Sequence, residues 1–309
     1  MQNDSWHCVG DGVLGVPKMQ NNMVIVIAGP TATGKTAFGI ELAQIISGEI
    51  VSADAMQIYK YMDIGTAKPT IEERNQIPHH MLDIISPFDN YSVSRYVTEA
   101  SQCIDNILSR NKTPIIVGGT GLYIDSLLSN RNFTKRASES IRNEIEHEYD
   151  KLGGDEMLRI LGEFDLQRAK RLHPNDKKRI VRAIEVYRVS GTTISQHDTE
   201  TKNSPPRYDA MKYALTVSDR IELYKRIDNR VDDMIEKGLA DEVRRLLDMG
   251  ISHNSTAMQA IGYKEMADAI IGLCDMDSAI DKIKMESRRY AKRQLTWFRR
   301  DPEIKWFEL

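Results

Sequence analysis

Residues 29–36 have the types and spacing of a phosphate-binding loop. Their sequence, Gly-Pro-Thr-Ala-Thr-Gly-Lys-Thr, fits the pattern G-x-x-x-x-G-K-[ST] and follows the apolar run Met23–Ala28. A glycine-rich turn placed there can aim successive backbone N–H groups at a phosphate chain, while Lys35 adds a mobile positive charge. The hydroxyl of Thr36 can hold Mg²⁺. The pattern predicts a site for a phosphorylated ligand, but it leaves open which phosphate is bound and which bond breaks.

Two further places supply groups for chemistry, each after an expected strand. Asp54 follows the apolar run 49–53, where a carboxylate can hold Mg²⁺ or accept a proton from a nucleophile, although aspartate also suits a helix N-cap. The turn 118–121 ends the apolar run 114–119 and adds the hydroxyl of Thr120. Its glycines either let a substrate approach the backbone or form a tight strand-to-helix turn. No aspartate ends this run, which argues against ordinary ATP hydrolysis.

Two arginines near the start of an expected helix over 219–237 can add to a phosphate site. Arg220 and Arg226 lie six residues apart, so both can converge on one ligand from adjacent turns. The planar fork of arginine donates to two oxygens at once, which suits a diphosphate.

Positive side chains gather in two segments with more than one interpretation. Residues 168–188 hold eight lysines or arginines and two acids. Helix spacing places Lys178, Arg179 and Arg182 on one face, either as a grip on a nucleic-acid backbone or as a solvated surface. The run 288–300 is also basic, but its interleaved aromatic residues are more often core than base-stacking platforms.

The elements that must position these groups alternate between strands and helices in the first third of the chain. Short apolar runs predict strands at 23–28, 49–53 and 114–119, and a returning strand at 213–217. Apolar residues at helix spacing predict a helix over 92–110. Such alternation is typical of a parallel sheet that is wound right-handedly and flanked by helices. Because ligands collect at the carboxyl ends of parallel strands, Asp54 is expected to face the phosphate loop.

From about residue 130 the pattern becomes helical, with helices expected at 138–152, 154–162 and 175–189. The polar stretch 191–206 predicts a linker. We therefore expect an α/β fold with a P-loop NTPase-like core at 23–130 and 207–309. A mostly helical insertion domain is expected at 131–206, and residues 1–22 are expected to be a loose leader.

Composition narrows the class of protein further. The 309 residues carry a formal net charge of −3, so no global field points to nucleic acid, although local basic patches remain compatible. Cys8, Cys103 and Cys274 show neither metal spacing nor a disulfide framework, which suits a reducing cytosol. No apolar run approaches the roughly 20 residues that cross a bilayer. These features predict a cytoplasmic protein without a membrane partner.

Several segments together resemble one family. The most specific is Asp-Ile-Gly-Thr-Ala-Lys-Pro at 63–69. The others are 29–36, 52–59, 118–123, 173–176, 261–264 and 290–298. Together they resemble the tRNA dimethylallyltransferases, also called tRNA isopentenyltransferases, from about residue 23 to 300.

The resemblance implies transfer of a dimethylallyl group from dimethylallyl diphosphate to N6 of adenosine 37, next to the anticodon of tRNAs that read codons starting with U. It implies that Asp54 is the general base and that Thr120 is its partner at the reaction centre. It implies diphosphate contacts at Gly29, Thr31, Ala32, Thr33, Gly34, Lys35, Thr36, Arg220 and Arg226. The implied cofactor is Mg²⁺ on Thr36.

The implied macromolecular partner is the tRNA anticodon stem-loop, and the protein is expected to be a monomer. The implied tRNA contacts are Asp54, Ala55, Met56, Gln57, Thr120, Arg142, Lys178, Arg179, Ile180, Val181, Arg182, Gln259, Ala260, Ile261, Gly262, Tyr263 and Lys264. Three of these depart from the family pattern: Ala55 replaces a common serine, Lys178 a frequent glutamine, and Gln259 a position that can be basic. The departures affect tRNA contacts rather than chemistry.

Two other classes of protein compete with this reading. A small-molecule kinase would share the phosphate loop, but the missing aspartate after the run 114–119 argues against it. A non-catalytic RNA-binding nucleotide switch would also share the loop, but the chain has no Asn-Lys-x-Asp motif for purine recognition.

Overall fold

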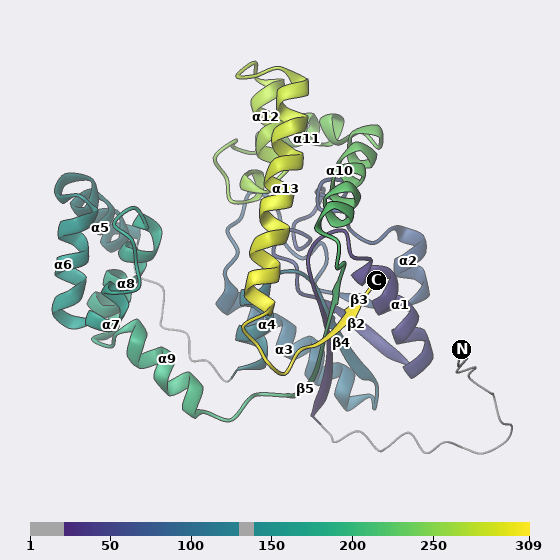
Figure 1. Ribbon diagram of the computed structural model, residues 1–309, viewed down its shortest axis with the longest axis horizontal. Coiled ribbons are helices and arrows are strands. Elements are labelled where there is room, and N and C mark those ends of the chain that lie inside the picture. The colour runs from purple at the N-terminus through teal and green to yellow at the C-terminus, as the bar shows by residue number, and fades with distance from the viewer. Residues whose placement is uncertain (1–21, 130–138) are drawn as a thin grey trace, which may run out of the picture.

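The protein is built on a parallel β-sheet flanked by helices, as seen in a computed structural model that describes residues 22–129 and 139–309 (Figure 1). The sheet has six strands in the order β3-β2-β4-β1-β5-β6, and each neighbouring pair is parallel. The strands are β1 (Met23–Ala28), β2 (Gly48–Ser52), β3 (His79–His80), β4 (Thr113–Val117), β5 (Asp209–Thr216) and β6 (Lys305–Glu308). The expected α/β class with a parallel sheet is confirmed.

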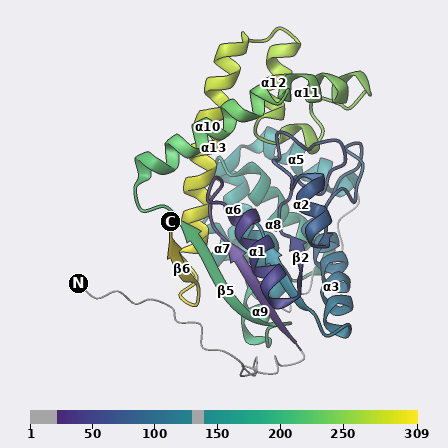
Figure 2. The ribbon, with the colours of Figure 1, turned by 90° about the vertical axis from the view of Figure 1, so that its right-hand side faces the viewer.

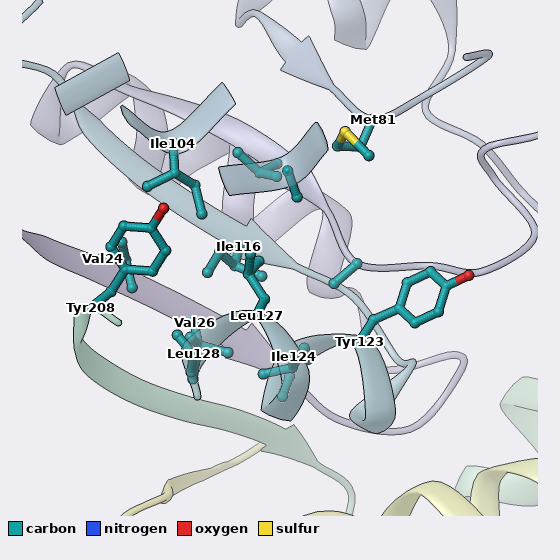
Figure 3. Close-up of a cluster of buried hydrophobic side chains, with 14 of the residues drawn as sticks. Val24, Val26, Met81, Ile104, Ile116, Tyr123, Ile124, Leu127, Leu128 and Tyr208 are labelled. Atoms are coloured by element: carbon teal, nitrogen blue, oxygen red, sulfur yellow. The ribbon is translucent and has the colours of Figure 1, made fainter. Parts of the chain in front are cut away.

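Both faces of the sheet are buried because successive side chains of a strand point to opposite sides. On one face Val24 and Val26 of β1 pack against α3 (Val93–Ser109) and α4 (Gly121–Leu128). On the other face Ile25 and Ile27 pack against α1 (Lys35–Ile46). Figure 3 shows the α3 and α4 side, with the side chains of Val24, Val26, Ile104, Ile116, Ile124, Leu127 and Leu128. This double burial explains why β1 and β4 are continuous apolar runs.

A second hydrophobic cluster lies beyond the sheet, where the last helices of the chain gather (Figure 1). It joins Val231 and Met234 of α10 to Leu239 and Val243 of α11, and all of them to the buried Tyr263. The helices here are α10 (Arg220–Glu236), α11 (Leu239–Asp248), η1 (Ala257–Gln259), α12 (Tyr263–Ile270) and α13 (Met276–Phe298), while the short helix α2 (Ile71–Gln76) lies beside α1. Helices α10 and α13 run from this cluster down to the sheet and so can wall a site at its edge.

The middle of the chain forms a separate helical group, which lies to the left of the sheet in Figure 1. Its helices are α5 (Glu139–Leu152), α6 (Gly154–Phe164), α7 (Leu166–Ala169), α8 (Lys177–Ser190) and α9 (Ile194–Asn203). They bury a hydrophobic cluster of their own, which includes Ile145, Met157, Leu161 and Ile184. Residues 139–203 therefore have a hydrophobic core of their own.

The structure corrects the sequence in two places. The stretch 191–206, predicted as a linker, contains α9, which starts with a capping box between Thr193 and Gln196. Because Pro205 and Pro206 follow the helix rather than interrupt it, the polar residues are free to become helical. The sequence analysis also missed the short edge strands β3 and β6. Figure 2 shows β6 beside β5.

Some expectations fall outside the described residues. The predicted leader spans residues 1–22, and only its last residue is described. The expected domain boundary at 130–131 lies outside the described residues. Asn22 is described, and its side chain donates to the Arg207 carbonyl at 2.8 Å. Among the described residues, no helix is long and apolar enough to cross a membrane.

Candidate active site

The predicted groups converge on one cavity of about 640 Å³ at the carboxyl ends of the central strands. The phosphate loop forms one wall, and Asp54 and Thr120 lie on the next, after β2 and β4. Helix α10 contributes Ile227, Arg230, Val231 and Met234, and α13 contributes Ile283, Ser287, Tyr290, Arg293 and Gln294. The site therefore draws on segments from the whole length of the core, as expected for the switch point of an open α/β sheet.

The backbone of the phosphate loop is held in an unusual shape. Gly29 has φ 133°, Ala32 has φ 64° and Gly34 has φ 67°. A Cβ on Gly29 would lie 2.4 Å from the Leu215 carbonyl oxygen on β5, so only glycine fits there. Helix α1 then begins at Lys35 without a side-chain cap, and its first-turn N–H groups have no intrahelical partners. The loop and helix start together make a ready anion site.

Lys35 lies in the cavity wall, where its Nζ donates to the Pro30 carbonyl at 2.5 Å. The pKa of Lys35 is lowered from 10.5 to about 7, mainly by burial and in part by the nearby Arg230, while Asp54 opposes the shift. A bound anion would stabilise the ammonium form. Lys35 is thus placed to gain charge as an anionic ligand binds.

Two arginines line this cavity, Arg230 of α10 and Arg293 of α13, and the sequence named neither of them as a diphosphate contact. Arg230 is the one that interacts with Asp54. Burial lowers the pKa of its guanidinium and the charge of Asp54 opposes that shift, so these two groups are close. Arg220 and Arg226 do not line the cavity: Arg220 donates to Tyr224, and Arg226 pairs with Glu222 at 2.9 Å. Both lie in the first two turns of α10, away from the lining of this cavity, so their contact with a diphosphate stays a prediction.

Asp54 is fixed by one oxygen and open at the other. Its Oδ1 accepts from the backbone N–H groups of Met56 at 2.9 Å and Gln57 at 3.4 Å. The Thr120 hydroxyl oxygen accepts from the N–H of Ala55 at 3.0 Å. Asp54 therefore caps a turn and not a helix, so the helix N-cap that was its alternative interpretation is not what forms. Its Oδ2 stays available for chemistry, because it makes no hydrogen bond to the described residues.

The turn that carries Asp54 is tied down by the side chain of Gln57. Its amide nitrogen lies within hydrogen-bonding distance of the Thr66 and Ala67 carbonyls, at 3.2 and 3.3 Å. Its amide oxygen accepts from the Ser52 hydroxyl at 3.1 Å. Gln57 was expected to contact tRNA, but both ends of its amide are engaged inside the protein.

The family-specific segment 63–69 is a support for that turn. The buried carboxylate of Glu242 accepts from the backbone N–H groups of residues 63–65 and from the hydroxyl of Tyr263. Lys68, also buried, donates to the Tyr59 carbonyl and pairs with Asp63 and Asp83 at 2.8 and 2.6 Å. The segment therefore supports the turn of Asp54 through Gln57, and Gly65, Thr66, Ala67 and Pro69 also line the cavity.

The glycines of the turn 118–121 serve packing within the protein. A Cβ on Gly118 would lie 2.2 Å from the Ala53 carbonyl oxygen, and one on Gly119 would lie 2.1 Å from Gln294 Nε2. A Cβ on Gly121 would meet the ring of Trp297 at 2.2 Å. The tight turn is present, and because Gly118 and Gly119 also line the cavity, the approach of a substrate to their backbone stays a prediction.

The residues expected to contact tRNA divide by exposure. Lys178 and Arg179 are exposed on α8, and Arg182 is half-buried beside Glu185. Ile180 and Val181 are buried in the core of the helical insertion. Because their side chains fill that core, they offer no surface to a docked nucleic acid, which corrects their expected role.

A second group lies near the mouth of the cavity. Gln259 is exposed, while Ala260 and Ile261 line the cavity itself. Tyr263 is fully buried, so its side chain supports Glu242 instead of touching a partner. Of the other expected tRNA contacts, Ala55 and Met56 line the cavity, and Arg142 on α5 pairs with Glu146. Gly262 precedes α12 with φ 95°, and Lys264 is half-buried.

The donors present suit a metal that is shared with its ligand. The described residues contain no cluster of three or more His, Cys, Asp or Glu that could hold an ion. Thr36 lies in the cavity wall beside the anion-binding loop. Mg²⁺ commonly takes few protein ligands and completes its shell with phosphate oxygens and water, so the Thr36 hydroxyl fits that pattern.

Comparisons with known proteins agree along most of the chain. Residues 57–301 match the family described as IPP transferase, and residues 22–86 match isopentenyl transferase. The chain is 51% identical over 286 residues to the tRNA dimethylallyltransferase of Carboxydothermus hydrogenoformans, covering 92% of this chain and 91% of the relative. It is 46% identical to that of Acetivibrio thermocellus, covering 92% and 90%.

Two solved structures are similar as well. The full-length tRNA isopentenylpyrophosphate transferase of Bacillus halodurans has a TM-score of 0.69 at 40% identity, covering 94% of this chain and 90% of that one. A eukaryotic dimethylallyltransferase acting on tRNA has a TM-score of 0.80 at 30% identity, covering 93% and 74%.

Proposed function

The chain belongs to the tRNA dimethylallyltransferase family, and we propose that it transfers a dimethylallyl group from dimethylallyl diphosphate to N6 of adenosine 37 in tRNA. The observation that carries the proposal is the single cavity shared by an anion-binding loop and the open oxygen of Asp54. The same neighbourhood in a P-loop NTPase-like core would hold a nucleoside triphosphate. Here it serves a diphosphate that departs.

The leaving group would occupy the loop 29–36. As the allylic C–O bond breaks, negative charge builds on the diphosphate, where backbone N–H groups, Lys35 and Arg230 can stabilise it. Losing one such donor typically costs about 3–4 kcal/mol of barrier. Mg²⁺, held by Thr36 and the diphosphate oxygens, would supply further charge neutralisation.

The nucleophile would approach from the Asp54 side. An exocyclic adenine amine is a weak nucleophile, so a carboxylate that takes its proton as the new C–N bond forms has a clear use. Oδ1 of Asp54 is engaged by the turn, which leaves Oδ2 to accept that proton. Thr120 lies beside this turn and can orient the base.

The adenine must leave its stack to reach this depth. Unstacking costs a few kcal/mol, and less in a single-stranded loop than in a duplex. The exposed Lys178 and Arg179 on α8 would hold the phosphate backbone of the anticodon stem. Such local contacts account for RNA binding by a chain whose net charge is −3.

Mass spectrometry of nucleosides tests this function. Unmodified bulk tRNA is incubated with the protein, dimethylallyl diphosphate and Mg²⁺, and the nucleosides are analysed. We expect N6-(dimethylallyl)adenosine, mapped to position 37 after nuclease digestion. Prenylation at another nucleoside would refute the site assignment, and the absence of any prenylated nucleoside would refute the function.

A further inference from the structure

Gln294 connects the two loops that hold the two halves of the reaction. It lies on α13 and is only 5% exposed. Its amide oxygen accepts from the backbone N–H of Thr31 at 2.9 Å, and its amide nitrogen donates to the Gly119 carbonyl at 2.9 Å. Thr31 belongs to the phosphate loop and Gly119 directly precedes Thr120. One side chain therefore spans from the diphosphate side of the cavity to the adenine side.

The sheet itself cannot make this connection. Strands β1 and β4 are neighbours, and their pairing extends to Ile27 and Val117. The N–H of Gly118 still donates to the Ile27 carbonyl at 3.2 Å. Beyond that point the two strands end and the backbone continues into separate loops. The primary amide of Gln294 then supplies one acceptor and one donor, as a peptide group would. The Gln294 amide thus joins the two loops beyond the strand ends, where the strands no longer pair.

The surroundings are shaped for this amide. A Cβ on Gly119 would lie 2.1 Å from Gln294 Nε2, so the close approach requires glycine at that position. Tyr290, one turn earlier on α13, lies near both Gln294 and Thr120 and lines the same cavity. A methionine side chain at this position has a similar length but cannot form either hydrogen bond well. An alanine side chain is too short to reach the two loops. Both loops are thus registered to the same face of α13.

We propose that Gln294 is a positioning residue for prenyl transfer, which sets the spacing between the phosphate loop and Thr120. The inference rests on the proposed function, since that spacing matters only if one loop holds the leaving group and the other lies beside the nucleophile. Reacting atoms must lie about 3–3.5 Å apart, and a misplacement of about 1 Å can cost about 100-fold in rate. Losing the bridge should therefore slow the transfer step itself.

The test measures single-turnover transfer at saturating dimethylallyl diphosphate and tRNA for the wild type, Gln294→Met and Gln294→Ala. Gln44→Met is the matched control, because Gln44 is exposed on α1 and its amide bonds only to Gln76. We expect Gln294→Met to lose about 10–100-fold in the rate constant per active site. The dissociation constants for both substrates should change by less than about threefold, because each loop keeps its own binding groups.

The outcomes separate positioning from a merely structural role. Active sites are titrated with dimethylallyl diphosphate, so a smaller folded fraction changes the amplitude and leaves the rate constant unaltered. A wild-type rate constant in Gln294→Met, or a loss of diphosphate affinity that matches the loss of rate, overturns the proposal. If Gln294→Met does not fold, Gln294→Ala at a lower temperature is read by the same criteria. An inactive wild type refutes the proposed function instead.

Discussion

The cavity of the core and the helical insertion solve different problems. In the core, the buried side chains of Glu242 and Gln294 and the half-buried side chain of Gln57 direct their hydrogen bonds to other protein groups. In the insertion, Lys178 and Arg179 of α8 stand exposed above a small independent core. The groups around the cavity are therefore fixed by several hydrogen bonds each, whereas recognition of a large polyanion needs accessible charge.

The contact between the insertion and the core differs from the contacts within the core. Helices α7 and α9 of the insertion face α4 and α13 of the core across a second cavity of about 290 Å³. Trp297 and Asp125, bonded to each other at 2.9 Å, line its core side, and Arg171 and Lys202 line its insertion side. Charged and polar side chains from both regions therefore line this junction.

The largest effect should come from the core, at Asp54. We expect Asp54→Asn to lower the rate constant for prenyl transfer by about 10²–10⁴, because the amide cannot accept the proton of the amine. The affinity for tRNA should be nearly unchanged, since the amide oxygen can still accept from the 56–57 turn. Rapid-quench kinetics and filter binding measure the two quantities. Asp209→Asn, at the exposed start of β5, is the matched control, and equal losses of rate and affinity would contradict the role of base.

The arginines of α10 give the next effect and decide between sequence and structure. Arg230→Ala should weaken binding of dimethylallyl diphosphate about 10–100-fold, the size of a lost charge-assisted contact. Arg226→Ala should change it less than about twofold, because Arg226 is half-exposed and paired with Glu222. Isothermal titration calorimetry gives both constants. The reverse order would restore the assignment to Arg226 that the sequence suggested.

The pH dependence of diphosphate binding should be smaller and traceable to Lys35. Its pKa of about 7 in the free protein means that the ammonium is present below pH 7 and is lost as the pH rises. The anion favours the ammonium, so the dissociation constant should increase by up to about tenfold per pH unit above 7. Lys35→Arg keeps its charge over this range, so subtracting its profile removes the ionisation of the ligand. Parallel profiles would show that Lys35 does not titrate.

The smallest effect should come from the insertion. Lys178→Ala should weaken tRNA binding only a few-fold and reduce the slope of log K against log salt by about 0.7–0.9, the release of one counterion. The rate constant at saturating tRNA should stay at the wild-type value. Lys237→Ala, an exposed lysine at the end of α10, is the control. An unchanged salt slope in Lys178→Ala would remove α8 from the interface, and a slower transfer step would undo the division between the two regions.

Local patterns were enough to predict much of this protein. The parallel sheet follows from doubly apolar runs, and the phosphate loop follows from glycine spacing in front of α1. Exposed basic residues on α8 follow from helix periodicity, but the same periodicity cannot say that Ile180 and Val181 face inward rather than toward RNA. The helix α9 was missed because its polar sequence gives no amphipathic signal, and its cap at Thr193 is a short motif within a loop-like composition.

The long-range bonds of the site could not be predicted in that way. The 3–4 residue spacing of Ile283, Ser287, Tyr290 and Gln294 places them on one face of α13, yet the spacing does not say what that face meets. Similarly, Arg220, Arg226 and Arg230 are equivalent donors on one helix until the tilt of α10 selects one. A pattern gives the face of a helix, and only its packing gives the neighbour.

The sequence by itself determined the chemistry that is possible: a loop that binds phosphate, a carboxylate after the second strand and a family-specific segment at 63–69. Tertiary structure alone decided which groups share the cavity, namely Arg230 with Asp54, and Gln294 between Thr31 and Gly119. The physical reason is the range of the interactions. Loop shape and helix start depend on residues a few positions apart, whereas these contacts depend on how helices from the end of the chain settle against strands from its beginning.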